Sequence, residues 1–155
     1  MPARKGEPAP PIALPDAPGH MVDLGEVFGK RKAVILFFPL AFSPVCTEEM
    51  CTFRDNWGKW EELGCDIYGI SVDSPFVTAK FRELEGIPFP VLSDFNKTVS
   101  RAYGCLHREL FGMKGFSKRA AFVVDASGNV VYRWVTNDPK NQVKFEAIRR
   151  AVKNC

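Results

Sequence analysis

Residues 32–46 read KAVILFFPLAFSPVC, and this stretch decides the fold. Residues 33–38 form a continuous apolar run closed by Pro39, which is typical of a strand buried on both faces of an α/β sheet. Ser43 and Pro44 then favour the start of a helix, because serine is a good N-cap and proline fits the first helical position. The stretch therefore predicts a strand over 32–38, a loop, and a helix with Cys46 in its first turn.

The helix that starts at residue 44 is expected to extend to residue 62. Its apolar side chains recur at spacings of four, three, four and three, which makes one buried stripe. The stripe consists of Cys46, Met50, Phe53, Trp57 and Trp60. Upstream of the first strand, residues 1–20 are rich in proline and glycine and favour an extended lead-in.

The remainder of the chain alternates between strand and helix patterns. The predicted elements are a strand over 66–72, a helix from 75 to 86 with Val77, Phe81 and Leu84 buried, a strand over 89–92, a helix over 97–103, a hairpin of 120–124 with 130–135, and a last helix with Phe145, Ile148 and Val152 on its core face. This order implies an α/β fold with a mixed central sheet flanked by helices. A length of 155 residues favours one domain, residues 1–155.

Composition excludes several classes of protein. The longest apolar run is far too short to span a membrane, and residues 1–11 lack the apolar segment of a secretory signal, so we expect a cytoplasmic protein. The net charge is only +3, and no nucleic-acid-binding motif accompanies it. The basic residues near the end are expected to form a solvated helix face. These residues are Lys140, Lys144, Arg149, Arg150 and Lys153.

The five cysteines argue against a disulfide-stapled secreted scaffold, because their number is odd and the chain is not small. There is no Cys-x-x-Cys motif and there are only two histidines, so zinc ligation is poorly supported. Free thiols, some of them reactive, are the expectation. Cys65 and Cys105 are interpreted as structural core residues.

Cys46 is the best candidate for a reactive thiol. Backbone N–H groups in the first turn of a helix have no intrahelical partner, and the helix dipole is positive at this end. Both effects favour the thiolate, which is the nucleophilic form. The alternative is that Cys46 is a small buried hydrophobe on the apolar stripe. Position alone thus indicates a reactive cysteine and does not specify its reaction.

Three residues of the opening stretch form a known pattern. Pro39, Ser43 and Cys46 fit Pro-x-x-x-(Thr/Ser)-x-x-Cys, and in this the chain resembles the peroxiredoxins. The resemblance runs from about residue 6 to the end and implies a thioredoxin-like fold. Other matching segments are Glu49, 53–55, 71–74, 92–94, 103–104, Arg119, 122–125 and 128–130.

The resemblance implies a role for each matching residue. Cys46 would be the peroxidatic nucleophile and would become a sulfenic acid. Ser43 would bind the peroxide oxygens, and Arg119 would stabilise the thiolate and the charge on the leaving oxygen. Pro39 would shield the sulfur from water, and Glu49 would orient an arginine. No metal, haem, flavin or other cofactor is implied.

Other interpretations of the same residues stay open at this point. Ser43 can be only an N-cap, and without the resemblance Pro39 is better explained as a strand terminator and Arg119 as a surface partner for a carboxylate. Serine at position 43 also differs from the threonine that is commoner in the family. It keeps the hydroxyl and lacks the methyl group that restricts χ1.

The partner of an oxidised Cys46 is the least determined feature. Cys51 lies five residues later, which on an intact helix places the two side chains about 140° apart, so a disulfide requires the helix to unwind. This spacing resembles the bacterioferritin-comigratory (Q-type) branch, whereas the run Phe-Phe-Pro-Leu-Ala-Phe-Ser resembles the one-cysteine E-type branch. Cys155, the last residue, and an external thiol are the alternatives.

The resemblance implies a thiol peroxidase that reduces hydrogen peroxide and organic hydroperoxides and is recycled by a thioredoxin-like donor. It permits a monomer or a homodimer. A thiol–disulfide oxidoreductase is a weaker alternative, because the paired Cys-x-x-Cys is missing. A non-enzymatic redox sensor or holdase on the same fold is a third possibility.

Overall fold

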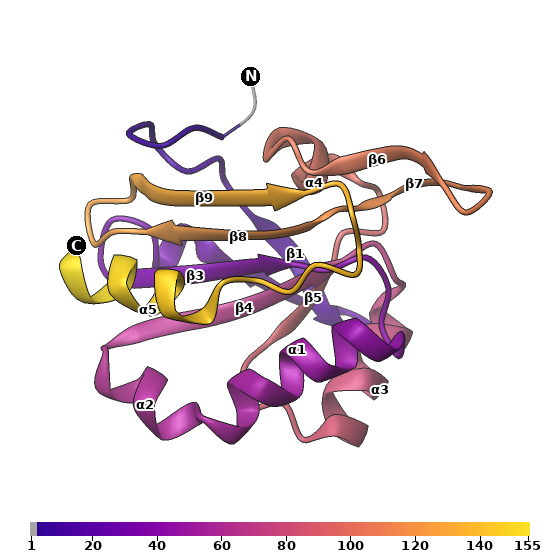
Figure 1. The fold of residues 1–155 in the computed structure, drawn as a ribbon, viewed down its shortest axis with the longest axis horizontal. Helices are drawn as coiled ribbons and strands as arrows, with labels where there is room; N and C mark the ends of the chain where they lie inside the picture. The colour runs from indigo at the N-terminus through magenta and orange to yellow at the C-terminus, as the bar shows by residue number, and fades with distance from the viewer. Residues whose placement is uncertain (1–2) are drawn as a thin grey trace.

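The computed structural model describes residues 3–155 and contains a mixed five-stranded sheet at its centre (Figure 1). The strands lie side by side in the order β5 (Val91–Ser93), β4 (Cys65–Ser71), β3 (Lys32–Phe37), β8 (Arg119–Val124) and β9 (Val130–Thr136). β3, β4 and β5 are parallel, while β8 is antiparallel to both β3 and β9. The expected α/β fold with a mixed sheet is therefore confirmed. Met1 and Pro2, the first residues of the expected lead-in, lie outside the described residues.

The middle strand explains the continuous apolar run of the sequence. In β3, Val34 and Leu36 point into one core, and Ile35 and Phe37 point into the other. All four side chains are fully buried. Both faces of this strand are covered, so polar residues have no solvent-facing position to occupy.

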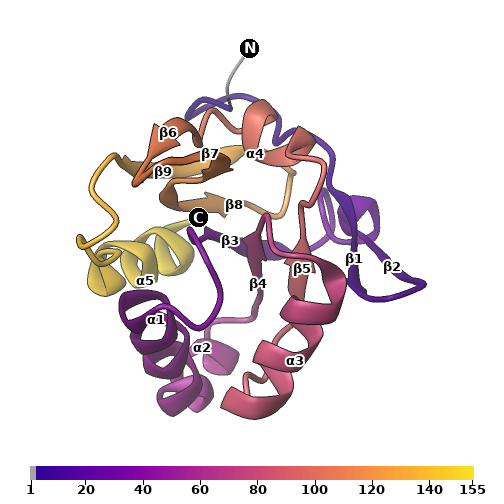
Figure 2. The same ribbon diagram turned by 90° about the vertical axis from the view of Figure 1, so that its right-hand side faces the viewer.

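Helices cover both faces of the sheet. The bounds are α1 (Pro44–Asp55), α2 (Trp57–Glu62), α3 (Pro75–Glu85), α4 (Thr98–Ala102) and α5 (Phe145–Asn154). Figure 2 shows α1, α2, α3 and α5 together on one side of the sheet and α4 on the other. Within the described residues, no helix is long and apolar enough to cross a membrane.

The predicted helix over 44–62 is wrong in one respect, because it is broken at Asn56. The backbone of Asn56 is not helical, and its side chain donates a hydrogen bond to the carbonyl of Thr52 at 2.8 Å. Asparagine side chains that bond nearby backbone groups compete with the helical pattern. The apolar stripe therefore runs over two helices, α1 and α2, and Trp57 is only half-buried.

The buried face of α3 also differs from the prediction. Leu84 is 61% exposed, and Thr78 is buried beside Phe81 instead. The expected strand over 89–92 is shifted to Val91–Ser93, which pairs with the end of β4. Pro90 precedes the strand, and proline is confined to the margins of strands because it lacks an N–H group.

Two hairpins were not predicted. β1 (Ala13–Ala17) pairs with β2 (His20–Asp23), so the expectation of an extended lead-in over residues 1–20 is wrong for this part. β6 (Leu106–Leu110) pairs with β7 (Met113–Ser117) through a turn at Phe111 and Gly112, both with positive φ. Most side chains of these strands are exposed or half-buried, so their sequences carry little alternation of apolar and polar residues. A short 3-10 helix, η1 (Leu24–Glu26), follows β2.

Candidate active site

Cys46 lies where the middle strand passes into α1. It is the third residue of the helix, after Pro44 and Val45, and its side chain is 1% exposed. Pro39 is buried in the loop between β3 and α1. The predicted strand, loop and helix thus place the thiol at the carboxyl end of β3, in the first turn of a helix.

Ser43 occupies the N-cap position of α1, but its hydroxyl does not cap the helix. The hydroxyl donates to the carbonyl of Leu40 at 2.8 Å, across the loop. The carbonyl of Ser43 accepts hydrogen bonds from the amide and the hydroxyl of Thr47, each at 2.9 Å. The side-chain cap expected from the sequence is therefore wrong, and the first-turn N–H groups beside Cys46 receive no acceptor from Ser43.

Arg119 brings a positive charge to the thiol. Its Nη2 donates to Cys46 Sγ at 3.2 Å, and the arginine side chain is 1% exposed. The same Nη2 donates to the carbonyl of Pro139 at 3.0 Å. Arg119 begins β8, and the next residue, Ala120, pairs with Phe37 at the end of β3. Strand pairing therefore delivers the guanidinium to the place where α1 starts, and the residue is not a surface partner.

Glu49 is the second partner of the guanidinium. It lies one turn after Cys46 on α1, is fully buried, and accepts from Arg119 Nη1 at 3.3 Å. Burial raises the pKa of Glu49 to about 7, although the charge and hydrogen bond of Arg119 oppose this rise. When Glu49 is protonated, its carboxyl no longer balances the charge of Arg119, and Cys46 Sγ is the other side-chain atom that this guanidinium contacts.

The loop before α1 is anchored by Asp73, whose role the sequence alone does not indicate. Its Oδ2 accepts from the amide of Ala41 and from the hydroxyl of Ser71, each at 2.7 Å. The next loop residue, Phe42, has a φ of 68°, which is unfavourable for a bulky side chain. Asp73 therefore helps to hold a strained loop. A Ser-x-Asp segment at the end of a buried strand is the available signal.

The two thiols that are not buried, Cys51 and Cys155, lie in different surroundings from Cys46. Cys51 is half-buried on α1, five residues after Cys46, and its thiol donates to Glu85 Oε2 at 3.5 Å. Cys155 follows α5 and donates to the carbonyl of Val152, which also accepts from Lys32 at the start of β3. Because Cys46 follows the other end of β3, about 17 Å of strand separates the two ends. Cys51 is thus the nearer candidate partner.

The two remaining thiols are buried, as expected for structural residues. Cys65 is 6% exposed and Cys105 is fully buried. Burial raises the pKa of Cys65 to about 11 and raises the pKa of Cys105 further. Both thiols therefore stay protonated near neutral pH. No disulfide links any of the five cysteines, which all lie within the described residues.

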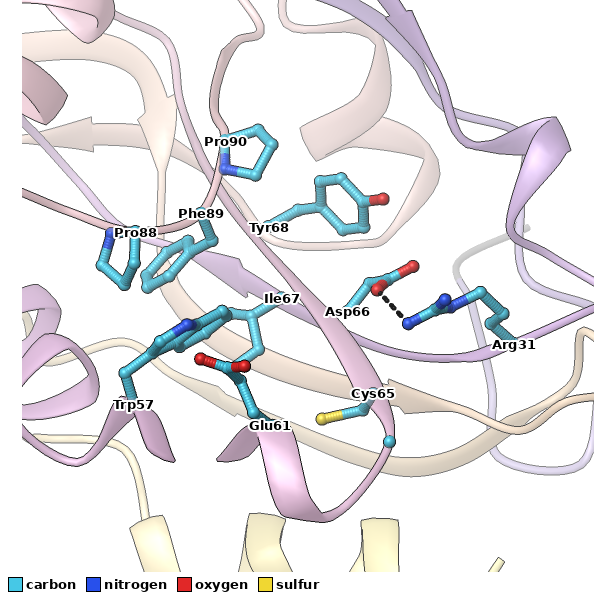
Figure 3. A pocket seen from close by; sticks show the side chains of 11 residues that line it. Arg31, Trp57, Glu61, Cys65, Asp66, Ile67, Tyr68, Pro88, Phe89 and Pro90 are labelled. Atoms are coloured by element: carbon cyan, nitrogen blue, oxygen red, sulfur yellow. Dashed lines mark hydrogen bonds and ion pairs between the residues drawn. The ribbon is translucent and has the colours of Figure 1, made fainter. Parts of the chain in front are cut away.

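A cavity of about 440 Å³ lies near the start of β4, away from Cys46 (Figure 3). Trp57 and Phe89 stack on one side of it, and Arg31 bonds Asp66 at 2.8 Å on the other. A second cavity, of about 560 Å³, lies beside α2 and the start of α5. Cys46 lines neither of these two cavities.

The thiol of Cys46 is thus held against a buried guanidinium at the junction of a central strand and a helix. Residues 5–133 match the model of the AhpC/TSA family. The match covers well over half of the chain, and the chain belongs to this family.

Individual known proteins are similar to this chain over most of its length. Peroxiredoxin Bcp of Escherichia coli strain K12 is 34% identical over 131 residues, which cover 83% of this chain and 83% of that protein. The crystal structure of Peroxidoxin BcpB from Mycobacterium tuberculosis superposes with a TM-score of 0.85 and 27% identity, covering 98% of this chain and 97% of that one. A peroxiredoxin-like protein from Aquifex aeolicus gives a TM-score of 0.87 and 26% identity, covering 99% of this chain and 88% of that one.

These similarities confirm the resemblance drawn from the sequence. The chain has the thioredoxin-like fold of the peroxiredoxins and is similar to their bacterioferritin-comigratory branch. It is an oxidoreductase, a thiol-dependent peroxidase whose substrate is a peroxide and whose reductant is a thiol.

Proposed function

We propose that Cys46 is the peroxidatic cysteine and that Arg119, Ser43, Pro39 and Glu49 complete its site. The observation that carries the proposal is the contact of 3.2 Å between Arg119 Nη2 and Cys46 Sγ, both buried. A guanidinium offers several fixed donors and stays charged, so it serves the thiolate before reaction and the leaving oxygen during it. Pro39 shields the sulfur, and Glu49 keeps the guanidinium oriented.

In the first step the Cys46 thiolate attacks one oxygen of the peroxide and the O–O bond breaks. The sulfur is oxidised to a sulfenic acid, and the other oxygen leaves as water or an alcohol after taking a proton. Arg119 stabilises the charge that develops on that oxygen. The Ser43 hydroxyl bonds Leu40 in the free enzyme and turns to the peroxide when substrate binds.

In the second step Cys51 attacks the sulfenic sulfur, a disulfide forms and water leaves. The side chains of Cys46 and Cys51 point about 140° apart on the intact helix, so the first turns of α1 must unwind. The support for Cys51 is its place on the same helix, its partial exposure, and the position of Cys155 near the other end of β3. A thioredoxin-like donor then reduces the disulfide.

The activity belongs to one domain, residues 1–155, working as a monomer or a homodimer. An odd number of cysteines without a Cys-x-x-Cys motif favours free thiols, which persist in a reducing compartment, and we place the enzyme in the cytoplasm.

The test is peroxide consumption with thioredoxin, thioredoxin reductase and NADPH. Wild type turns over, Cys46→Ser does not, and Cys51→Ser completes one reduction per chain and then stalls. Undiminished turnover by Cys46→Ser would refute the assignment. Full turnover by Cys51→Ser would show that Cys155 or an external thiol resolves the sulfenic acid, and the Cys51→Ser, Cys155→Ser double variant would distinguish the two.

A further inference from the structure

The last residue of α3 bonds the second half of α1. Glu85, the last residue of α3, accepts the Cys51 thiol at its Oε2, at 3.5 Å. Its backbone carbonyl accepts from Arg54 Nη1 at 2.6 Å. Two side chains of α1, one turn apart, therefore bond the same residue of α3.

Three charged groups face the Cys51 thiol: Arg54 and Asp55 from α1, and Glu85 from α3. Burial raises the pKa of this thiol, and the hydrogen bond and charge of Glu85 raise it further, while Arg54 opposes the rise. A thiol that donates to a carboxylate is protonated, and a protonated thiol is a poor nucleophile. In the folded helix Cys51 is therefore kept unreactive.

Unwinding of α1 changes these surroundings. A disulfide with Cys46 requires the Cys51 side chain to swing around the helix axis, away from α3. The hydrogen bond to Glu85 breaks in that movement, and the thiol is exposed to water. The Glu85 carboxylate, which favours the protonated thiol, thus no longer contacts Cys51 when Cys51 must act as a nucleophile.

We propose that Glu85 is a positioning residue that docks the reduced Cys51 thiol on α3 and releases it only when α1 unwinds. The proposal rests on the resolving role of Cys51 given above. After release the thiol loses its proton to solvent, and the thiolate attacks the sulfenic sulfur of Cys46. The S–S bond forms as the S–O bond breaks, and the oxygen leaves as water with a proton from solvent. Glu85 thereby makes unwinding a condition for resolution.

The first experiment measures docking without requiring resolution. In a chain with Cys46→Ser and Cys155→Ser, Cys51 is the one cysteine that is not buried. Its alkylation by iodoacetamide is followed across pH, with and without Glu85→Gln. We expect the substitution to move the profile to lower pH and to speed alkylation by about three- to tenfold near pH 8, since one pKa unit is worth a factor of ten in thiolate.

The matched control is Glu83→Gln on the same helix. Glu83 is exposed and contacts Lys80 at 3.6 Å, so its loss removes the same charge from α3 without touching Cys51. This control leaves the alkylation profile unchanged. If Glu85→Gln behaves like Glu83→Gln, Glu85 does not dock the thiol and the proposal is wrong.

The second experiment measures the coupling to resolution. Chains that retain all their cysteines receive one equivalent of hydrogen peroxide, and Cys46–Cys51 disulfide formation is timed by acid quench and thiol labelling. Glu85→Gln should form the disulfide about two- to fivefold faster, and an unchanged rate would overturn the coupling. A wild-type chain that forms no such disulfide would refute the resolving role instead, and the alkylation profile would still decide the docking.

Discussion

Replacing Arg119 with lysine separates the charge at the site from its geometry. The guanidinium bonds Cys46, Glu49 and the Pro139 carbonyl at once, through two nitrogens. A lysine ammonium keeps the positive charge but is a compact point donor that cannot span these partners. The loss of one hydrogen bond to a charged group costs about 1.5–3 kcal/mol. The second-order rate constant for hydrogen peroxide should therefore fall about 10- to 150-fold.

The assay for Arg119→Lys is stopped-flow tryptophan fluorescence, because Trp57 and Trp60 of α2 pack near α1 and report its changes. Arg133→Lys is the matched control. That arginine also bonds a backbone carbonyl, of Ala3 at 3.0 Å, and lies 5.8 Å from the Phe122 ring, with no contact to Cys46. The control should react at the wild-type rate. A wild-type rate for Arg119→Lys would refute the role of the guanidinium.

Two further predictions concern Asp73, which bonds the loop before α1, and Glu49, which pairs with Arg119. Asp73→Ala removes the acceptor of the Ala41 amide, at about 1.5–3 kcal/mol, and should lower the peroxide rate constant about tenfold, with Asp73→Asn restoring part of it. The control is Asp94→Ala, which removes a carboxylate that accepts from two amides of α4 and does not contact the Ala41 loop. An equal fall of the peroxide rate constant in Asp73→Ala and Asp94→Ala would contradict the anchoring role of Asp73. Burial raises the pKa of Glu49 to about 7, so this carboxyl stabilises the fold below its unfolded pKa and the contribution is lost as pH rises through 7. In denaturant unfolding, wild type should lose about 2 kcal/mol more than Glu49→Gln between about pH 5 and pH 8, and parallel profiles would contradict this.

The elements that carry the site could be predicted because their signals are local. The apolar run of β3 reflects burial on both faces. Two consecutive residues, Ser43 and Pro44, mark the start of α1. Arg119 lies 73 positions from Cys46, and only resemblance to a family connected them. The physical cause, pairing of β8 with β3, is a tertiary property that local pattern does not report.

The features that sequence reasoning missed depend on packing between distant segments. The Ser43 hydroxyl was expected to accept from a first-turn amide of α1, yet in the folded loop it donates to the Leu40 carbonyl and accepts from no amide of the helix. The hairpin of β6 and β7 is largely exposed, so hydrophobic periodicity gave no sign of it. The Glu85 contact with Cys51 joins two helices 34 positions apart in sequence and follows from how they pack.

The most direct test of the central claim identifies the sulfur that peroxide oxidises first. Reduced protein is mixed with one equivalent of hydrogen peroxide, quenched over a time series in a sulfenic acid trap, and digested under denaturing, non-reducing conditions. Cleavage after Glu48 or Glu49 separates Cys46 from Cys51, so a disulfide between them appears as a linked pair of peptides. We predict trapped sulfenic acid on Cys46 at the earliest times, followed by the Cys46–Cys51 pair. Earlier oxidation of Cys51 or Cys155, with Cys46 still reduced, would contradict it.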